Sequence, residues 1–88
     1  MDLNQLREIL DLVRTHAGAV LGSAPEAVDT ASNFLELGFS SFTALALCNG
    51  LREATGCEIP PVAVFDNPTP AALATYLRTR LTTPSPTH

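Results

Sequence analysis

Two adjacent hydroxyl side chains, Ser40 and Ser41, are the groups in this sequence best placed for covalent chemistry. They follow Leu37-Gly38-Phe39 and precede a stretch with helical periodicity. Backbone N–H groups at the start of a helix lack intrahelical acceptors, and the helix dipole favours an anion there. A phosphodiester on Ser41 would lie in that field, but two ordinary capping serines would account for the same residues. The residue types alone leave both interpretations open.

Catalysis by either serine is not favoured. A hydrolase nucleophile elbow reads Gly-x-Ser-x-Gly, and Phe42 stands where its second glycine would be. The candidate bases are His16, expected as a solvated residue near a helix end, and His88, at the end of a Pro-rich stretch. Cys48 and Cys57 lack the paired partners of a zinc site and are expected as buried or half-buried thiols. We expect no catalytic residue and no metal site.

The composition describes one small acidic domain. The chain has 88 residues, a net charge of −4 and no lysine, so it lacks the clustered basic side chains that nucleic-acid binding needs. Between residues 21 and 69, six acidic side chains accompany a single arginine, which favours a partner with a basic docking surface. No apolar run approaches the ~18 residues that span a bilayer, and no signal peptide is recognisable. We expect no membrane partner and a cytoplasmic location.

Hydrophobic periodicity predicts an all-helical domain over residues 1–81, followed by a Pro/Thr-rich linker tail over residues 82–88. Gly56 is a helix-ending signal, and Thr69-Pro70 is a typical helix start. Leu73, Tyr76 and Leu77 should share a buried face, with Leu81 as a candidate fourth member. The expected segments are helices over residues 3–22, 41–55 and 70–81, and at most a short helical turn over residues 62–65.

A long connection, residues 22–38, lies between the first two predicted helices. It is rich in Gly, Ser, Pro and Asp, yet it carries Phe34, Leu35 and Leu37, which we expect to place their side chains in the core. Long loops in small domains are uncommon unless they are ordered and functional. We therefore expect this loop to be ordered and functional.

The helix predicted over residues 41–55 has two apolar faces. At 100° per residue one face is a core stripe, and full burial of the opposite face would be difficult in so small a domain. We expect that opposite face to be exposed for partners; the alternative is that Phe42 and Leu45 pack beneath the long loop. The core stripe comprises Ala44, Leu47, Cys48 and Leu51, and the outer face comprises Phe42, Leu45, Ala46, Asn49 and Glu53.

Two motifs in this chain resemble those of one family. The first runs Leu37-Gly38-Phe39-Ser40-Ser41-Phe42-Thr43-Ala44-Leu45, and the second runs from Val64-Phe65-Asp66-Asn67-Pro68-Thr69-Pro70 to Ala74, after Ile59-Pro60. Together they resemble the Leu-Gly-Phe-Asp-Ser-Leu-Thr-Ala-Val and Phe-Asp-His-Pro-Thr-Pro signatures of acyl carrier domains from modular type I polyketide synthases. The resemblance covers residues 3–81.

The resemblance implies a four-helix bundle, with three main helices, a short third helix and a long ordered first loop. It also implies that a phosphopantetheinyl transferase attaches 4'-phosphopantetheine from coenzyme A to Ser41. The domain, a monomer when isolated, would then carry polyketide acyl intermediates as thioesters without catalysing any step. Its partners would be ketosynthase, acyltransferase and other polyketide synthase domains.

This chain departs from the family pattern around the serine. Ser40 replaces the usual Asp, which keeps a capping group but removes a negative charge beside the modification site. Ala46, Cys48 and Gly50 occupy positions that are often charged, so Glu53 is the only acid on this helix. We therefore expect partners to be bound by apolar contacts at Phe42, Leu45 and Ala46, with the surrounding charges setting orientation.

Two other functions remain open. A peptidyl carrier domain of a nonribosomal peptide synthetase would share the fold and the arm, although that family usually has Gly-Gly-His-Ser before the modification. A docking or scaffold module that is never modified would use the apolar outer face only for binding, and the loss of the Asp at Ser40 is its one point of support. A mass gain on treatment with a transferase would distinguish the scaffold from either carrier.

Overall fold

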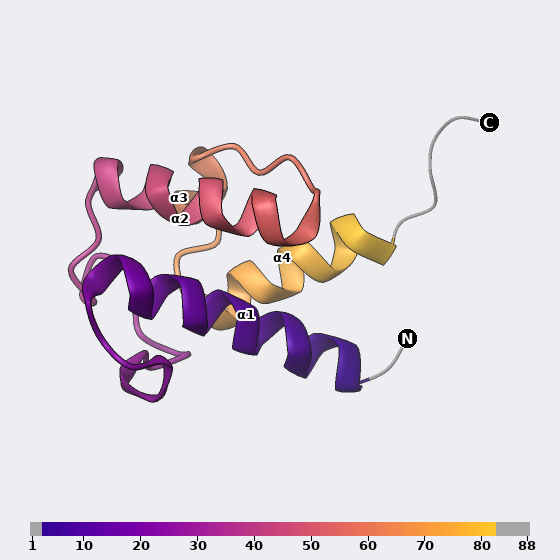
Figure 1. The fold of residues 1–88 in the computed structure, drawn as a ribbon, viewed down its shortest axis with the longest axis horizontal. Helices are drawn as coiled ribbons and strands as arrows, with labels where there is room; N and C mark the ends of the chain where they lie inside the picture. The colour runs from indigo at the N-terminus through magenta and orange to yellow at the C-terminus, as the bar shows by residue number, and fades with distance from the viewer. Residues whose placement is uncertain (1–2, 83–88) are drawn as a thin grey trace.

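The computed structural model of the protein describes residues 3–82, and within them the chain is all-helical (Figure 1). This confirms the predicted fold class: three long helices and a short third one, with a long first loop. No helix in this part of the chain is long and apolar enough to cross a membrane. The elements are α1 (Leu3–Leu21), the 3-10 turn η1 (Pro25–Ala27), α2 (Ser41–Thr55), α3 (Val62–Asp66) and α4 (Pro70–Thr82).

Helix α1 is the packing centre of the bundle. It contacts both α2 and α4 and runs antiparallel to them, so the α1–α2 loop lies at one end of the molecule (Figure 1). The predicted α2 stripe is buried throughout, with Leu47 and Leu51 fully inaccessible. Apolar side chains spaced by three and four residues supply the core from each long helix. The core members on these three helices include Ile9, Val13, Ala17, Ala44, Leu47, Cys48, Leu51, Leu73, Ala74 and Leu77.

The helix ends follow the local sequence. Gly56 has a left-handed φ of 73° and ends α2 by donating its N–H to the Arg52 carbonyl at 2.7 Å. The Thr69 hydroxyl caps α4 by accepting the Ala72 N–H at 3.1 Å. Pro70 is the first residue of α4, where its missing N–H costs no hydrogen bond. Both of these predicted boundaries are confirmed.

Three side chains lie elsewhere than predicted. Leu35 is 65% exposed, because its N–H is held by the Asn33 side chain at 2.8 Å in a turn that directs Leu35 outward. Leu81 is 37% exposed, one turn beyond the last fully buried leucine of α4. His16 is half-buried: its imidazole lies so close to Gly50 that a Cβ there would be 2.8 Å from His16 Nδ1.

The predicted boundary between domain and tail stays a prediction. Helix α4 ends at Thr82, one residue beyond the predicted domain end. The rest of the predicted linker, residues 83–88, lies outside the described residues.

Candidate functional site

Ser41 is the first residue of α2 and its side chain is exposed. Within residues 3–82 its hydroxyl makes no hydrogen bond. The first N–H groups of a helix point outward without intrahelical acceptors, and the dipole makes this end favourable for negative charge by about 0.3–1 kcal/mol. The position combines an accessible, unengaged hydroxyl with surroundings that suit a phosphate ester.

Ser40, in contrast, is engaged in capping the same helix. It is extended, with φ −121° and ψ −178°, and its Oγ accepts the Thr43 N–H at 3.4 Å. In return, Thr43 Oγ1 accepts the Ser40 N–H at 2.7 Å, which completes a capping box. The two neighbouring hydroxyls therefore differ: one holds the backbone and the other is free for chemistry.

The chain entering the site is anchored immediately before the serines. Gly38 has a left-handed φ of 102°, which a side chain would strain, and this turn directs Phe39 into the core. The Phe39 N–H donates to the Phe34 carbonyl at 2.9 Å, and the two rings pack edge to face. The position of Ser41 is thus set by a buried aromatic pair on one side and by helix α2 on the other.

The first loop is ordered, as its length suggested, because other elements pair with its backbone. The Phe34 N–H donates to the Pro68 carbonyl at 2.7 Å, and the Ala71 N–H donates to the Thr30 carbonyl at 3.0 Å. Val28 and Phe34 are buried, and Leu37 packs partly against the core. These bonds tie the loop to the start of α4, far away in sequence.

One acidic side chain contributes to the order of this loop. The Ala31 N–H donates to the Asp29 carboxylate at 3.0 Å. That hydrogen bond, with smaller contributions from the Ser32 hydroxyl and the Arg14 charge, holds the pKa of Asp29 below its ordinary value. Asp29 therefore acts as a turn-forming anion in the loop.

The outer face of α2, which we define as Phe42, Leu45, Ala46, Asn49 and Glu53, is exposed at every position. Phe42 is 79% exposed and Leu45 is 44% exposed, which excludes the alternative in which both pack beneath the loop. A phenylalanine so open to water, one residue after Ser41, is costly in solvent and suited to burial against another surface.

Further exposed apolar residues were missed by sequence reasoning. Val62 is 55% exposed and Phe65 is 47% exposed, both on the short helix α3, and Leu35 of the first loop is exposed as well. Helix α3 has only five residues, too few for a periodicity that tells its buried side from its open one. In the structure Ala63 and Val64 face the core, and Val62 and Phe65 lie at the surface.

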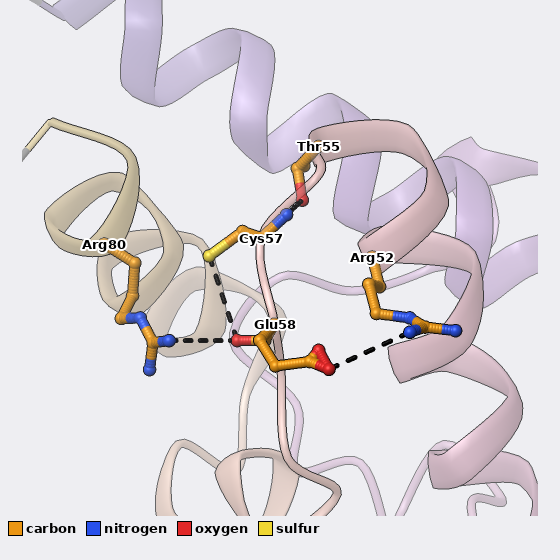
Figure 2. A network of polar contacts seen from close by, with 5 residues as sticks. All are labelled: Arg52, Thr55, Cys57, Glu58 and Arg80. Atoms are coloured by element: carbon orange, nitrogen blue, oxygen red, sulfur yellow. Dashed lines mark hydrogen bonds and ion pairs between the residues drawn. The ribbon is translucent and has the colours of Figure 1, made fainter.

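A polar network lies at the opposite end of α2, where the chain turns toward α3 (Figure 2). Arg80 of α4 donates to the Glu58 carbonyl at 3.0 Å, while the Glu58 carboxylate is 3.8 Å from Arg52. Both charged partners of the ion pair are well exposed, so it adds little stability. The Arg80 bond joins the α2–α3 connection to α4, a link that sequence reasoning did not identify.

The two thiols are buried or half-buried, as the sequence predicted. Cys48 is buried, and desolvation raises the pKa of its thiol. Cys57 is half-buried, and its N–H donates to the Thr55 hydroxyl at 3.1 Å (Figure 2). Neither lies beside the serines in the chain, and burial makes Cys48 a core residue without a reactive role.

An open hollow of about 350 Å³ lies between α1 and η1. Its lining mixes two carboxylates, Asp11 and Glu26, with Arg14 and Thr15, and contains neither serine. It is not part of the site around Ser41.

Comparison with known families gives a match over most of the chain. Residues 11–77 match the family model described as "Phosphopantetheine attachment site". Mycoketide-CoA synthase of Mycobacterium tuberculosis is 52% identical over 79 residues, covering 89% of this chain. The pikromycin polyketide synthase component PikAIII of Streptomyces venezuelae is 54% identical over 70 residues, covering 78% of it. The chain spans only 2% and 4% of the lengths of these relatives.

Solved structures show the same fold. An acyl carrier structure described as "A1-type ACP domain from module 5 of MLSA1" is 40% identical, with a TM-score of 0.83, covering 89% of this chain and 79% of that one. A free-standing peptidyl carrier protein from Acinetobacter baumannii is 30% identical with the same TM-score of 0.83, covering 88% of this chain and 96% of that one.

Proposed function

The chain belongs to the phosphopantetheine attachment-site family, and we propose that Ser41 is its attachment residue. Members of this family carry a covalently attached 4'-phosphopantetheine, and the relatives of this chain include components of polyketide synthases. The observation that carries the proposal is the contrast between the two serines. The Ser41 hydroxyl is exposed and unengaged at the start of α2, while the neighbouring Ser40 hydroxyl accepts the Thr43 N–H.

The residues around Ser41 suit the attachment chemistry. Its Oγ would form a bond to the phosphorus that bears the pantetheine of coenzyme A, as the pyrophosphate linkage breaks and adenosine 3',5'-bisphosphate leaves. The hydroxyl proton passes to a base on the transferase, since the chain offers no histidine next to Ser41 in sequence. Once formed, the phosphodiester anion lies at the N-terminus of α2, where the dipole stabilises it. The thiol of the attached arm supplies the site of thioester formation.

We propose that the acyl groups carried are polyketide intermediates. The identities of 52% and 54% to polyketide synthase components support this assignment. The alternative of a peptidyl carrier shares the fold, as the 30% identical structure illustrates, but it is not favoured by the residues before Ser41, Gly38-Phe39-Ser40.

The partners follow from this role. We propose a phosphopantetheinyl transferase as the activating enzyme, and ketosynthase, acyltransferase and other synthase domains as the partners that exchange acyl groups. The exposed outer face of α2 supports docking beside Ser41, with Phe42 and Leu45 as apolar anchors. The domain itself would catalyse no step, would be monomeric in isolation, and would act in the cytoplasm, where coenzyme A is available.

The experiment is an intact-mass measurement before and after incubation with coenzyme A and a promiscuous transferase. The expected result is a gain of one phosphopantetheine per chain. A folded protein that gains no mass would contradict the proposal and favour the unmodified docking module.

A further inference from the structure

We propose that Thr43 is a positioning residue for Ser41, because its hydroxyl holds the peptide from which Ser41 projects. This inference rests on the proposed attachment of the arm to Ser41. Thr43 would take no direct part in the chemistry. Its role would be to keep the Ser41 hydroxyl in one orientation.

The Thr43 hydroxyl forms hydrogen bonds with both backbone polar groups of Ser40. Thr43 Oγ1 accepts the Ser40 N–H at 2.7 Å and donates to the Ser40 carbonyl at 3.2 Å. That carbonyl, which also accepts the Ala44 N–H at 2.9 Å, belongs to the same planar peptide unit as the N–H of Ser41, so its orientation fixes the plane from which Ser41 begins. The Thr43 side chain is itself restrained, since β-branched residues have few χ1 choices in a helix.

The distances show which half of the capping box is the stronger. The Thr43 oxygen lies 2.7 Å from the Ser40 nitrogen, whereas the Ser40 oxygen lies 3.4 Å from the Thr43 nitrogen. An N–H···O bond near 2.9 Å is well formed, and one near 3.4 Å is weak. Of the two side chains in the capping box, Thr43 therefore supplies the shorter bond, although Ser40 is the residue at the conventional capping position.

The orientation of Ser41 depends on the capping box because no hydrogen bond holds the Ser41 side chain itself. Its hydroxyl makes no hydrogen bond within the described part of the chain and is exposed. The nearest buried residues along the sequence are Phe39 before it and Ala44 after it. Without the Thr43 hydroxyl the first turn of α2 would fray, and a smaller fraction of molecules would present Ser41 in the reactive geometry.

The test compares three variants in phosphopantetheinyl transfer from coenzyme A, measuring kcat and KM for the carrier. Thr43→Val removes the hydroxyl with little change of shape, and Thr43→Ser restores it. Thr75→Val is the matched control, since Thr75 also donates to a backbone carbonyl, that of Ala71 at 3.1 Å, but in α4. We expect Thr43→Val to lower kcat about fivefold, as the loss of one cap would, with KM little changed. Thr43→Ser and Thr75→Val should match the parent.

Amide hydrogen exchange gives a second readout that does not need the transferase. The Ser40 N–H should exchange faster in Thr43→Val than in the parent or in Thr43→Ser, because its acceptor is gone. If Thr43→Val does not fold, Thr43→Ala removes the same hydroxyl with a residue of higher helix propensity.

Either of two results with Thr43→Val would overturn the inference: a parental kcat, or an unchanged Ser40 exchange rate. A Thr43→Ser variant as slow as Thr43→Val would also overturn it, because the defect would then not come from the hydroxyl. If the parent protein itself gains no arm, the proposed attachment fails, while the exchange comparison still decides whether Thr43 restrains the turn.

Discussion

The rings of Phe34 and Phe39 pack edge to face, with their centroids 5.1 Å apart and an interplanar angle of 69°. Both rings are buried, and Phe39 lies two residues before Ser41. This pair joins the first loop to the start of α2, so the packing that stabilises the bundle also places the Ser41 hydroxyl. A loop residue and the residue before the α2 cap thereby pack as one structural unit.

The aromatic pair gives a prediction about stability. Replacing Phe39 with alanine should lower the free energy of unfolding by about 3–5 kcal/mol, because a buried ring is lost and a cavity remains. Phe42→Ala is the matched control, three residues further on but 79% exposed, and should change stability by less than about 0.5 kcal/mol. Urea unfolding followed by circular dichroism measures both. Similar losses in the two variants would show that Phe39 does not anchor the loop.

A second prediction concerns the contact between α1 and α2. Alanine is favoured over glycine inside a helix by about 1 kcal/mol, but at position 50 its Cβ would lie 2.8 Å from His16 Nδ1. Gly50→Ala should therefore stabilise the parent by less than this amount, because the half-buried His16 ring must move aside. In a His16→Ala background the same substitution should stabilise the protein more than in the parent, because the obstructing ring is gone.

The difference between the two effects of Gly50→Ala in that double-mutant cycle is the informative quantity. It is measured from thermal or urea unfolding of the four proteins. If Gly50→Ala had the same effect with and without the His16 ring, the close approach of the two helices at this point would be wrong.

The sequence was sufficient for the regular part of the fold. Helix α2 begins and ends at the predicted residues, because its apolar stripe repeats with the helical period and Gly56 ends it. Leu35 was wrongly predicted to be buried, since its direction depends on the Asn33 side chain and on the Phe34 bond to Pro68. The Asn33 contact is a local turn and the Phe34 bond joins distant residues, and neither leaves a period in the sequence.

The candidate site could be predicted only in part. The motif around Ser41 predicts by resemblance that this residue is the attachment site, but residue types alone did not distinguish it from Ser40. The difference between them lies in hydrogen bonds: Thr43 pairs with one serine and not with its neighbour. Side-chain pairing across a single helical turn depends on the backbone angles of the cap, which the sequence does not state.

A third prediction tests docking on the outer face of α2. In the holo protein, Phe42→Ala and Leu45→Ala should each reduce acyl transfer by the cognate partner about tenfold, since truncating an interface anchor costs on the order of 1–2 kcal/mol. Both side chains are exposed, so the fold should be unaffected. The measurement is the transfer rate at partner concentrations below saturation.

Leu81→Ala is the control for this surface, because Leu81 is 37% exposed but lies on α4. It should transfer at the parental rate. Parental rates in both α2 variants, with normal thermal unfolding, would place the partner contact on another face.

The central claim is tested most directly by locating the arm after transfer from coenzyme A, using intact mass and fragmentation of the modified peptide. Ser40→Ala should still gain one phosphopantetheine, because the Ser40 hydroxyl serves as a cap, and the modified residue should be Ser41. Ser41→Ala, which removes an exposed hydroxyl that makes no hydrogen bond within residues 3–82, should fold normally and gain no mass. A mass gain that persists in Ser41→Ala and disappears in Ser40→Ala would contradict the account.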